Sequence, residues 1–350
     1  MRQTAAMTES PGIDGARVTA WLAERLPGLV PPVDYQLIAG GHSNLTYLAR
    51  DHTGRQWVIR RPPLGHVLPT AHDMGREHRI ISALAGSRVP VPPTVGICPD
   101  LAVNGAPFFV MDFVDGFVLR DTAAAQSMIG EAERAVAGEQ LIEVLAALHA
   151  IDPESVGLGD LGRREGYISR QLDRWYGQWQ RSKDRELPAI DEVYTTLSAR
   201  VPAQQTSGIV HGDYRVDNCI VGPDGAIRAV LDWELCTLGD VLADLGIMMV
   251  YWSEPGDEAG GSLGQPTLAA GFPSRADLIE RYARITGRDV SAIPYYMAFG
   301  YWKLACILQG VYIRYASGDM GQAGSIATQM PAAITGLAEA ARAAIGGLPD

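Results

Sequence analysis

The stretch Ile209–Val221, IVHGDYRVDNCIV, places an apolar run on each side of a group of polar residues. Such runs are typical of short buried strands, so the polar residues between them belong to a loop. Further along, CIV and AIRAVL enclose GPDG, in which Pro and Gly are typical of a turn. We therefore expect a hairpin that begins just after the polar loop.

The expected hairpin would bring two polar side chains to its open end, because Asn218 enters the first strand and Asp232 leaves the second. An amide oxygen and a carboxylate at one place suit Mg²⁺, which takes one or two protein ligands and completes its coordination with water and substrate phosphates. Asp213 lies on the loop before Asn218, where its carboxylate can accept a hydrogen bond from an incoming hydroxyl and direct it at phosphorus. The pattern therefore predicts phosphoryl transfer.

The bulk composition narrows the class of protein. A chain of 350 residues is long for one compact core and favours two lobes. The net charge of −11, without a run of Lys and Arg, argues against nucleic acid as a partner. The four cysteines form no CxxC pair, so we expect neither disulfides nor a zinc site, and a cytoplasmic location. Residues 1–17 lack the apolar core of a signal peptide and are expected to form a disordered polar tail.

The pattern of expected elements changes near residue 115. Before it, LTYLAR and QWVIRR predict two strands joined by a DHTG turn, and AHDMGREHRIISAL predicts a helix. After it, helical spacing dominates. We expect an α+β protein with an N-terminal lobe over 18–114, a C-terminal lobe over 115–350 and a crevice between them.

One apolar stretch, Pro294–Ile313, is nearly long enough to cross a bilayer. Lys303 near its middle would cost about 2.5–3.5 kcal/mol on insertion, and Gln309 adds to that cost. A buried helix is the better interpretation, and we expect no membrane partner.

The run HGDYRVDN followed by VLDWELCTLGDVLADLG resembles the catalytic core of the aminoglycoside phosphotransferase family, which are small-molecule kinases. The segments YRVDN, LDWE and YWKLACILQGVYIRY are most similar to the branch found as a kinase-like domain fused to some acyl-CoA dehydrogenases. The resemblance extends from about Gly40 to about Arg314. It implies a two-lobed protein-kinase-like fold, with ATP and Mg²⁺ as cofactors.

The same resemblance implies roles for residues of the polar loop. Asp213 matches the catalytic aspartate, and Asn218 and Asp232 match the Mg²⁺ ligands. His211 would be the structural histidine of the loop, and Asp244 would brace the loop from the next helix. Arg215 and Asp217 lie between Asp213 and Asn218. We expect each of them either to orient the loop or to contact the substrate.

In the N-terminal lobe, the resemblance implies a nucleotide site. AGGHSN would cover the ATP phosphates, with Ser43 and backbone N–H groups as donors. Arg60 in WVIR would hold the α- and β-phosphates, and Glu77 would be its partner from the helix. Backbone groups of a hinge segment would contact adenine, and these belong to Asp112, Phe113 and Val114.

Two departures from the family pattern leave alternatives open. Arg60 stands where most kinases carry lysine, although its planar guanidinium can clamp a phosphate, and Gly239-Asp240-Val241 replaces a Gly-Asp-Pro turn. A catalytically degenerate protein that binds nucleotide or CoA is one alternative. An ordinary surface ion pair is the alternative for Arg60 and Glu77. A two-metal hydrolase is improbable, because no histidine follows Asp232.

We expect the acceptor to be a hydroxylated small molecule of one of two classes. The family name points to aminoglycosides, whereas the dehydrogenase-linked branch points to a hydroxyacyl-CoA or related metabolite. We favour the second, because the family's C-terminal helices line the acceptor site and Tyr295–Arg314 would present a largely apolar wall. Lys303 and Arg314 also carry the wrong charge for the amines of an aminoglycoside. The sequence leaves the oligomeric state and the choice between ATP and GTP open.

Overall fold

The computed structural model of the protein describes residues 10–39, 44–64, 73–257, 264–317 and 324–348. Its contacts divide the chain into two compact units. Unit 1 contains Met1–Ser87 and Val91–Asp115. Unit 2 contains Arg88–Pro90 and Gly116–Asp350.

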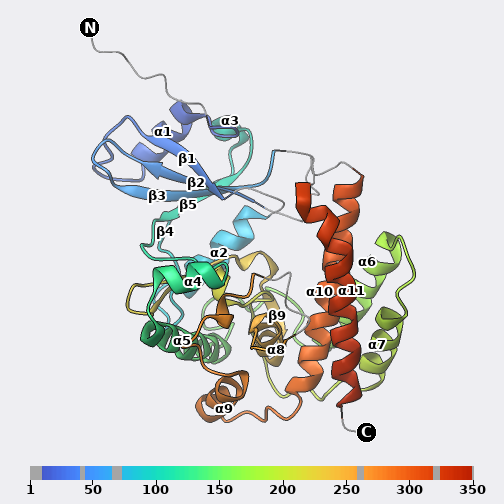
Figure 1. Ribbon diagram of the computed structural model, residues 1–350. Coiled ribbons are helices and arrows are strands. Elements are labelled where there is room, and N and C mark those ends of the chain that lie inside the picture. The colour runs from blue at the N-terminus through green and yellow to red at the C-terminus, as the bar shows by residue number, and fades with distance from the viewer. Residues whose placement is uncertain (1–9, 40–43, 65–72, 258–263, 318–323, 349–350) are drawn as a thin grey trace. The chain divides into compact units, whose positions relative to one another are not determined.

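Unit 1 is built on one antiparallel sheet of five strands in the order β1-β2-β3-β5-β4 (Figure 1). The two strands expected from LTYLAR and QWVIRR pair as a hairpin, which confirms the prediction. The Asp51 carboxylate closes its turn by accepting hydrogen bonds from the N–H groups of Thr53 and Arg55. The strands are β1 (Asp34–Ala39), β2 (Leu45–Arg50), β3 (Gln56–Arg61), β4 (Thr94–Cys98) and β5 (Phe108–Asp112).

A helix packs on each face of this sheet. Successive side chains of a strand point to opposite faces, so one strand can supply apolar contacts to both helices. On one face, Tyr47 and Phe108 join Trp21 of α1 (Gly15–Ala23) in an apolar cluster. On the other face, the ring of Phe109 lies with its centroid 6.1 Å from that of His78 in α2 (Met74–Leu84). Adjacent residues of β5 thus serve both layers.

Aspartate caps set where these helices begin. The Asp73 side chain accepts the N–H of Arg76 and starts α2 inside the helix expected from AHDMGREHRIISAL. Asp14 does the same for Arg17 and starts α1 within residues 1–17, which were expected to be a tail. The tail was inferred from the lack of an apolar run, and a short capping signal does not depend on such a run. Unit 1 also contains the short helix α3 (Leu101–Asn104).

Unit 2 is mainly helical, as the periodicity after residue 115 predicted, and contains two short strand pairs. β6 (Ser207–Val210) pairs with β9 (Thr237–Asp240), and β7 (Cys219–Val221) pairs with β8 (Ile227–Val230), all antiparallel. The sequence predicted the β7–β8 hairpin but not the β6–β9 pair. Short 3₁₀ turns are η1 (Val216–Asn218), η2 (Trp233–Leu235) and η3 (Pro266–Leu268). The helices are α4 (Thr122–Met128), α5 (Glu131–His149), α6 (Tyr167–Ser182), α7 (Pro188–Ala199), α8 (Leu242–Tyr251), α9 (Arg275–Thr286), α10 (Ile293–Ala316) and α11 (Gly324–Gly346).

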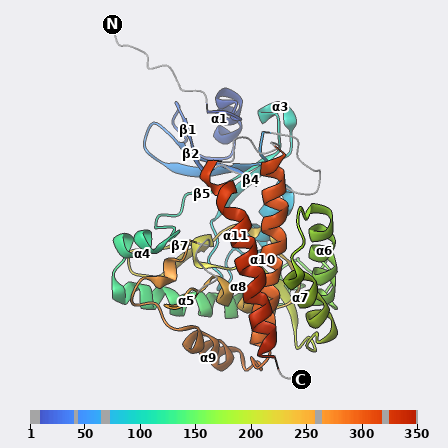
Figure 2. The ribbon, with the colours of Figure 1, turned by 45° about the vertical axis from the view of Figure 1, so that its right-hand side comes forward.

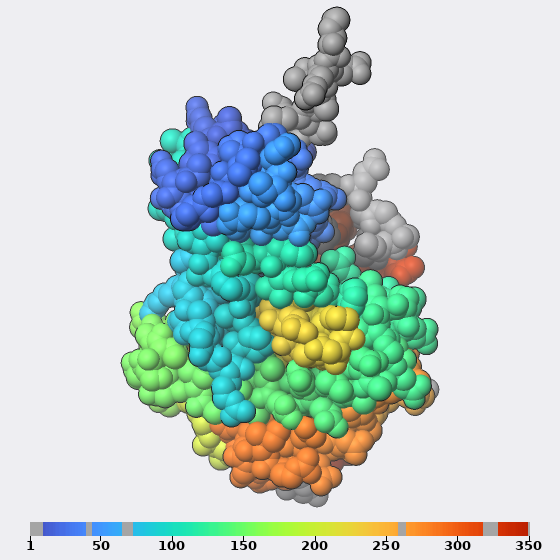
Figure 3. All heavy atoms as spheres, turned by 90° about the vertical axis from the view of Figure 1, so that its left-hand side faces the viewer, coloured from blue at the N-terminus to red at the C-terminus, as the bar shows by residue number. Residues whose placement is uncertain are grey.

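The β7–β8 hairpin confirms the prediction made from CIV, GPDG and AIRAVL. Cys219 lies opposite Val230, and the Gly222 N–H donates to the Ala226 carbonyl across the turn, 2.8 Å from N to O. At the surface of unit 2 the hairpin, yellow in Figure 3, lies beside α5. The Ile227 N–H donates to a side-chain oxygen of that helix at 2.9 Å.

The apolar stretch at 294–313 forms the core of α10, as expected for a buried helix. α10 and α11 run side by side in both ribbon views (Figures 1 and 2). The indole N–H of Trp302 donates to the Ile190 carbonyl of α7 at 3.0 Å, so the helix is anchored on both sides. No helix among the described residues is long and apolar enough to span a bilayer.

Candidate active site

Two neighbouring loops carry the polar residues of the quoted stretch and its continuation. The 211–218 loop joins β6 to β7, and residues 231–236 join β8 to β9. Because β6 pairs with β9 and β7 with β8, the two loops lie together. The Leu231 N–H donates to the Asn218 carbonyl at 2.8 Å, and the ring of His211 bonds the Leu231 carbonyl at 2.9 Å.

The imidazole of His211 supports the loop, as expected. Its Nδ1 accepts the Asp213 N–H at 3.3 Å, so the ring proton is on Nε2 and is donated to the Leu231 carbonyl. The ring is fully buried and lies 4.7 Å from the ring of Trp233, centroid to centroid. Both ring nitrogens are therefore occupied, which fits a structural role.

The structure brings Asp213 and Asn218 into direct contact. The side-chain amide of Asn218 donates from Nδ2 to the Asp213 carboxylate and to its backbone carbonyl, each at 2.9 Å. With Nδ2 bound in this way, Oδ1 of Asn218 is the atom that can bind a cation. Asn218 is 8% exposed, whereas Asp213 is only half-buried and so remains accessible to a substrate.

Asp232 follows β8 at the open end of the hairpin and is half-buried. Its backbone is left-handed, with φ of 64°, which is uncommon for a residue other than glycine and often marks a functional site. The described residues contain no cluster of three His, Cys, Asp or Glu side chains able to hold a metal. The amide oxygen of Asn218 and the carboxylate of Asp232, which the sequence predicted as Mg²⁺ ligands, are oxygen donors of the kind that suits an ion also bound by phosphates and water.

Arg215 sits at the centre of the carboxylates. Its Nε lies 3.1 Å from a carboxylate oxygen of Asp217 and 3.4 Å from one of Asp213, and its guanidinium stacks 4.5 Å over the ring of Tyr251. Burial lowers the pKa of Arg215, but the negative charges of Asp213, Asp217 and Asp232 outweigh it and raise that pKa overall. The arginine therefore stays charged and orients the loop.

Burial raises the pKa of the Asp217 carboxyl, whereas it lowers that of Arg215. The positive charge of Arg215 lowers the pKa of Asp217 and the negative charge of Asp213 raises it, and the result is a pKa of about 6. Burial also raises the pKa of Tyr251, as does the negative charge of Asp213. The phenol therefore stays neutral and serves as a platform for the guanidinium.

Asp244, at the start of α8, holds the loop from behind. Its two carboxylate oxygens accept the backbone N–H groups of His211 at 2.6 Å and Gly212 at 2.8 Å. Burial alone would raise the pKa of Asp244, but the hydrogen bond and charge interaction with His149 lower it overall. The aspartate is thus the brace that the resemblance implied.

Lys303 is the contact that the sequence reasoning missed. It is 5% exposed, and its Nζ in α10 donates to the Gly212 carbonyl at 2.9 Å. We considered this lysine only as an obstacle to membrane insertion and as a charge against aminoglycosides. A lysine in a buried apolar helix needs a polar partner. This rule is the signal by which the sequence could have linked Lys303 to a polar site.

In unit 1, Arg60 of β3 and Glu77 of α2 form an ion pair with 3.1 Å between Nε and a carboxylate oxygen. The two side chains are 12% and 3% exposed, so the alternative of an ordinary surface pair is excluded. Asp112 ends β5 and donates its N–H to the Pro93 carbonyl at 2.8 Å. Phe113 and Val114 follow it on a partly exposed segment. Ser43 lies outside the described residues.

The apolar wall expected along Tyr295–Arg314 is only partly present. Several of its large side chains turn into the core, where the Tyr295 hydroxyl donates to the Leu197 carbonyl at 2.9 Å. Tyr296 donates its hydroxyl to the Asp240 carboxylate at 2.6 Å, also in the core. The half-buried positions on this part of α10 include Ile307, Leu308, Val311 and Tyr312.

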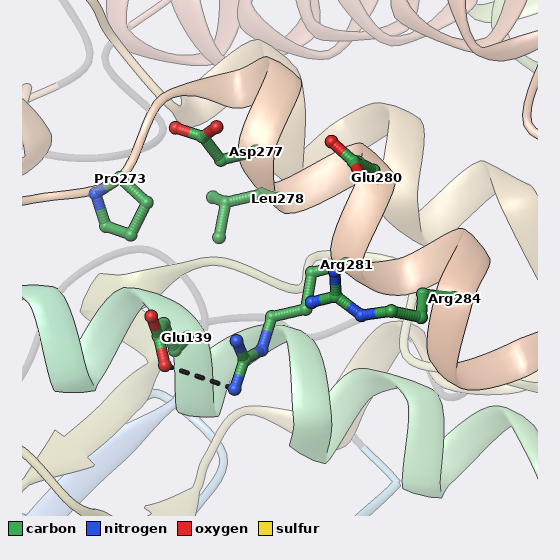
Figure 4. A pocket seen from close by; sticks show the side chains of 7 residues that line it. All are labelled: Glu139, Pro273, Asp277, Leu278, Glu280, Arg281 and Arg284. Carbon is green, nitrogen blue, oxygen red and sulfur yellow. Dashed lines mark ion pairs between the residues drawn. The ribbon is translucent and has the colours of Figure 1, made fainter.

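A separate cavity of about 290 Å³ lies between α5 and α9 (Figure 4). Arg281 of α9 points across it and forms an ion pair with Glu139 of α5 at 3.1 Å. Its lining includes none of the residues predicted for the site. The cavity is therefore distinct from the candidate active site.

A protein-family model and several known proteins match most of this chain. Residues 34–283 match the model of the phosphotransferase enzyme family. The chain is 34% identical over 87% of its length to acyl-CoA dehydrogenase family member 10 of Mus musculus. It is 33% identical over 96% of its length to acyl-CoA dehydrogenase family member 11 of Rattus norvegicus. The chain spans only 28% and 44% of the length of these two relatives.

Solved structures confirm the α+β, protein-kinase-like fold. A protein from Ralstonia eutropha, provisionally assigned as an aminoglycoside phosphotransferase, is 31% identical with a TM-score of 0.81, and the match covers 96% of this chain and 99% of that one. The GDP complex of aminoglycoside 2'-phosphotransferase-IIIa is 14% identical with a TM-score of 0.60, over 94% of this chain and 99% of that one. The second likeness concerns the fold alone.

Proposed function

The chain belongs to the phosphotransferase enzyme family, and from this premise we propose that it transfers the γ-phosphoryl group of ATP to a hydroxyl of a small molecule. The observation that carries the proposal is the pair of hydrogen bonds from Asn218 to Asp213, formed beside Asp232 at the open end of the hairpin. A base for the acceptor and two donors for a cation are the parts that phosphoryl transfer needs besides the nucleotide.

Within unit 2, Asp213 accepts the hydrogen bond of the acceptor hydroxyl and aims its oxygen at phosphorus. Asn218, through Oδ1, and Asp232 would hold Mg²⁺. The metal, when bound, neutralises phosphate charge and aligns the reacting groups. Arg215 keeps the Asp213 carboxylate in place, because it contacts that carboxylate and is itself fixed by Asp217 and Tyr251.

Unit 1 binds the nucleotide in this proposal. Arg60 contacts the α- and β-phosphates, and its buried pair with Glu77 fixes the direction of the guanidinium. The end of β5 and the partly exposed segment after it bind adenine through backbone groups of Asp112, Phe113 and Val114. The phosphate contact predicted for Ser43 falls outside the described residues. Solved neighbours are complexes with GDP or with ADP, so both ATP and GTP belong in the binding test.

For the acceptor we propose a hydroxyacyl-CoA or a related hydroxylated metabolite. Support comes from the curated relatives, which are named as members of the acyl-CoA dehydrogenase family. The apolar positions of α10 support it less than expected, because much of that helix faces the core. An aminoglycoside is the second candidate, favoured by the assignment of the Ralstonia protein.

The test measures phosphorylated product and ADP release with the purified chain, Mg²⁺ and either nucleotide. One panel holds hydroxyacyl-CoA esters with the hydroxyl at different carbons, each matched by the same ester without the hydroxyl. A second panel holds aminoglycosides. We expect product only from hydroxylated esters. Product from aminoglycosides alone would reverse the choice of acceptor, and failure to bind either nucleotide by calorimetry would contradict phosphotransfer.

A further inference from the structure

Lys303 reaches the candidate active site from α10, an element far from the 211–218 loop in the sequence. The lysine is 91 residues from Gly212 along the chain, yet its ammonium donates to the Gly212 carbonyl at 2.9 Å. It lies in the middle of α10, whose anchors on α7 and on the β6–β9 pair fix the helix in unit 2. The position of the ammonium is therefore set by the core.

The accepting carbonyl belongs to the peptide that joins Gly212 to Asp213. The N–H of that same peptide donates to Nδ1 of His211, and the preceding N–H donates to the Asp244 carboxylate. Gly212 has φ of 88°, and a Cβ there would come within 2.9 Å of the Leu235 carbonyl oxygen, so only glycine fits. Lys303 thus supplies the hydrogen bond that fixes the carbonyl side of this peptide.

The orientation of this peptide sets the direction in which the Asp213 side chain leaves the backbone. The charged groups that act on Lys303 are the carboxylates of Asp213 and Asp244 and the guanidinium of Arg174 on α6. Burial lowers the pKa of Lys303 overall, although the two carboxylates raise it. The amino group of Lys303 is thus a desolvated hydrogen-bond donor near the proposed base, buried there at a cost to stability.

We infer that Lys303 is a positioning residue for phosphoryl transfer, which acts by holding the Gly212–Asp213 peptide so that the Asp213 carboxylate faces the acceptor. This inference rests on the proposed function. Misplacing a reacting group by about 1 Å can lower turnover about a hundredfold. A residue that only stabilised the fold would not change turnover separately from thermal stability.

The test compares two buried polar residues of the same helix. Lys303→Met keeps the length of the side chain and removes the donor, and Lys303→Arg keeps a charged donor. Gln309→Met is the matched control, because Gln309 is fully buried in α10 and bonds the Ser182 carbonyl instead of the 211–218 loop. For each variant, kcat, the KM of the acceptor, the Kd of the nucleotide and Tm are measured.

We expect Lys303→Met to lower kcat about ten- to hundredfold, with KM and Kd changed less than about threefold and a small change in Tm. Lys303→Arg should restore part of kcat. Gln309→Met should lower Tm and leave kcat within about threefold. If Lys303→Met retains kcat, loses kcat only in step with Tm, or cannot be obtained folded, the lysine is structural and the inference is overturned.

A double-mutant cycle separates this inference from the proposed function. If Lys303 acts through Asp213, Lys303→Met should have little further effect on kcat in an Asp213→Asn background. Additive losses would overturn the inference while leaving the role of Asp213 intact. Normal turnover of Asp213→Asn by itself would instead overturn the proposed function.

Discussion

The 211–218 loop and the cavity between α5 and α9 both gather charged side chains, but they differ in burial and in the number of elements that hold them. In the loop, Asp213 is contacted by Asn218 and Arg215, and helices α8 and α10 bind the backbone beside it. In the cavity, Arg281 pairs with Glu139, a carboxylate that is 50% exposed (Figure 4). Contacts from several elements on one side chain, more than the number of charges nearby, therefore distinguish the candidate active site from the cavity.

This difference predicts that the largest effect on activity comes from the loop. Asp213→Asn keeps the shape of the side chain but removes the base, and we expect kcat to fall about a thousandfold. The Kd of the nucleotide, measured by calorimetry, should change little, because the carboxylate acts on the acceptor. A variant with normal turnover would place the chemistry elsewhere.

A second prediction tests whether burial makes the Arg60–Glu77 ion pair important for folding stability. Arg60→Met removes the cation from Glu77, which is 3% exposed, and such a loss costs about 3–5 kcal/mol of folding stability. Urea unfolding measures it, and nucleotide affinity should fall as well. Arg60→Lys is the control that keeps the charge. A loss below about 1 kcal/mol would show that the pair behaves like one at the surface.

The sequence predicted what depends on nearby residues. The β7–β8 hairpin followed from two strand-like runs around a Pro-Gly turn. The sequence also placed Asp213 and Asn218, five residues apart, near one site, and the structure adds the direct contact between their side chains. The brace from Asp244 came from a family resemblance, because no local pattern links it to the loop 32 residues before it. Local chemistry and family patterns together therefore located the candidate loop.

The sequence did not predict what depends on packing over long separations. The contact of Lys303 with Gly212 arises only when α10 is packed beside the loop. The same helix is apolar around much of its circumference, so periodicity does not reveal which face is buried. For that reason Tyr295 and Tyr296 were expected on an acceptor wall but lie in the core.

A third prediction concerns the support behind the loop and its dependence on pH. Burial lowers the pKa of His149, although hydrogen bonding and charge interaction with Asp244 raise it. Below the ordinary histidine pKa near 6.5, the unfolded chain takes up a proton that the folded chain does not, so stability falls as the pH falls.

In unfolding experiments between pH 7 and pH 5, the native protein should lose stability more steeply than His149→Gln. The Asp244 carboxylate, whose pKa is lowered overall, adds its own loss of stability only under more acidic conditions, below the ordinary aspartate pKa of about 4. Parallel curves for the two proteins between pH 7 and pH 5 would mean that His149 takes up a proton equally in both states.

The smallest effect is expected at the cavity between α5 and α9. Arg281 bonds carboxylates of α5 that are each 50% exposed, and exposed ion pairs contribute about 0–1 kcal/mol because water and salt screen them. Arg281→Gln should therefore change the free energy of unfolding by less than about 1 kcal/mol and leave kcat within about twofold. Chemical unfolding and turnover with the acceptor found for the native protein measure both. A large loss of turnover would mean that α9 influences the 211–218 loop, and the contrast between the two regions would then fail.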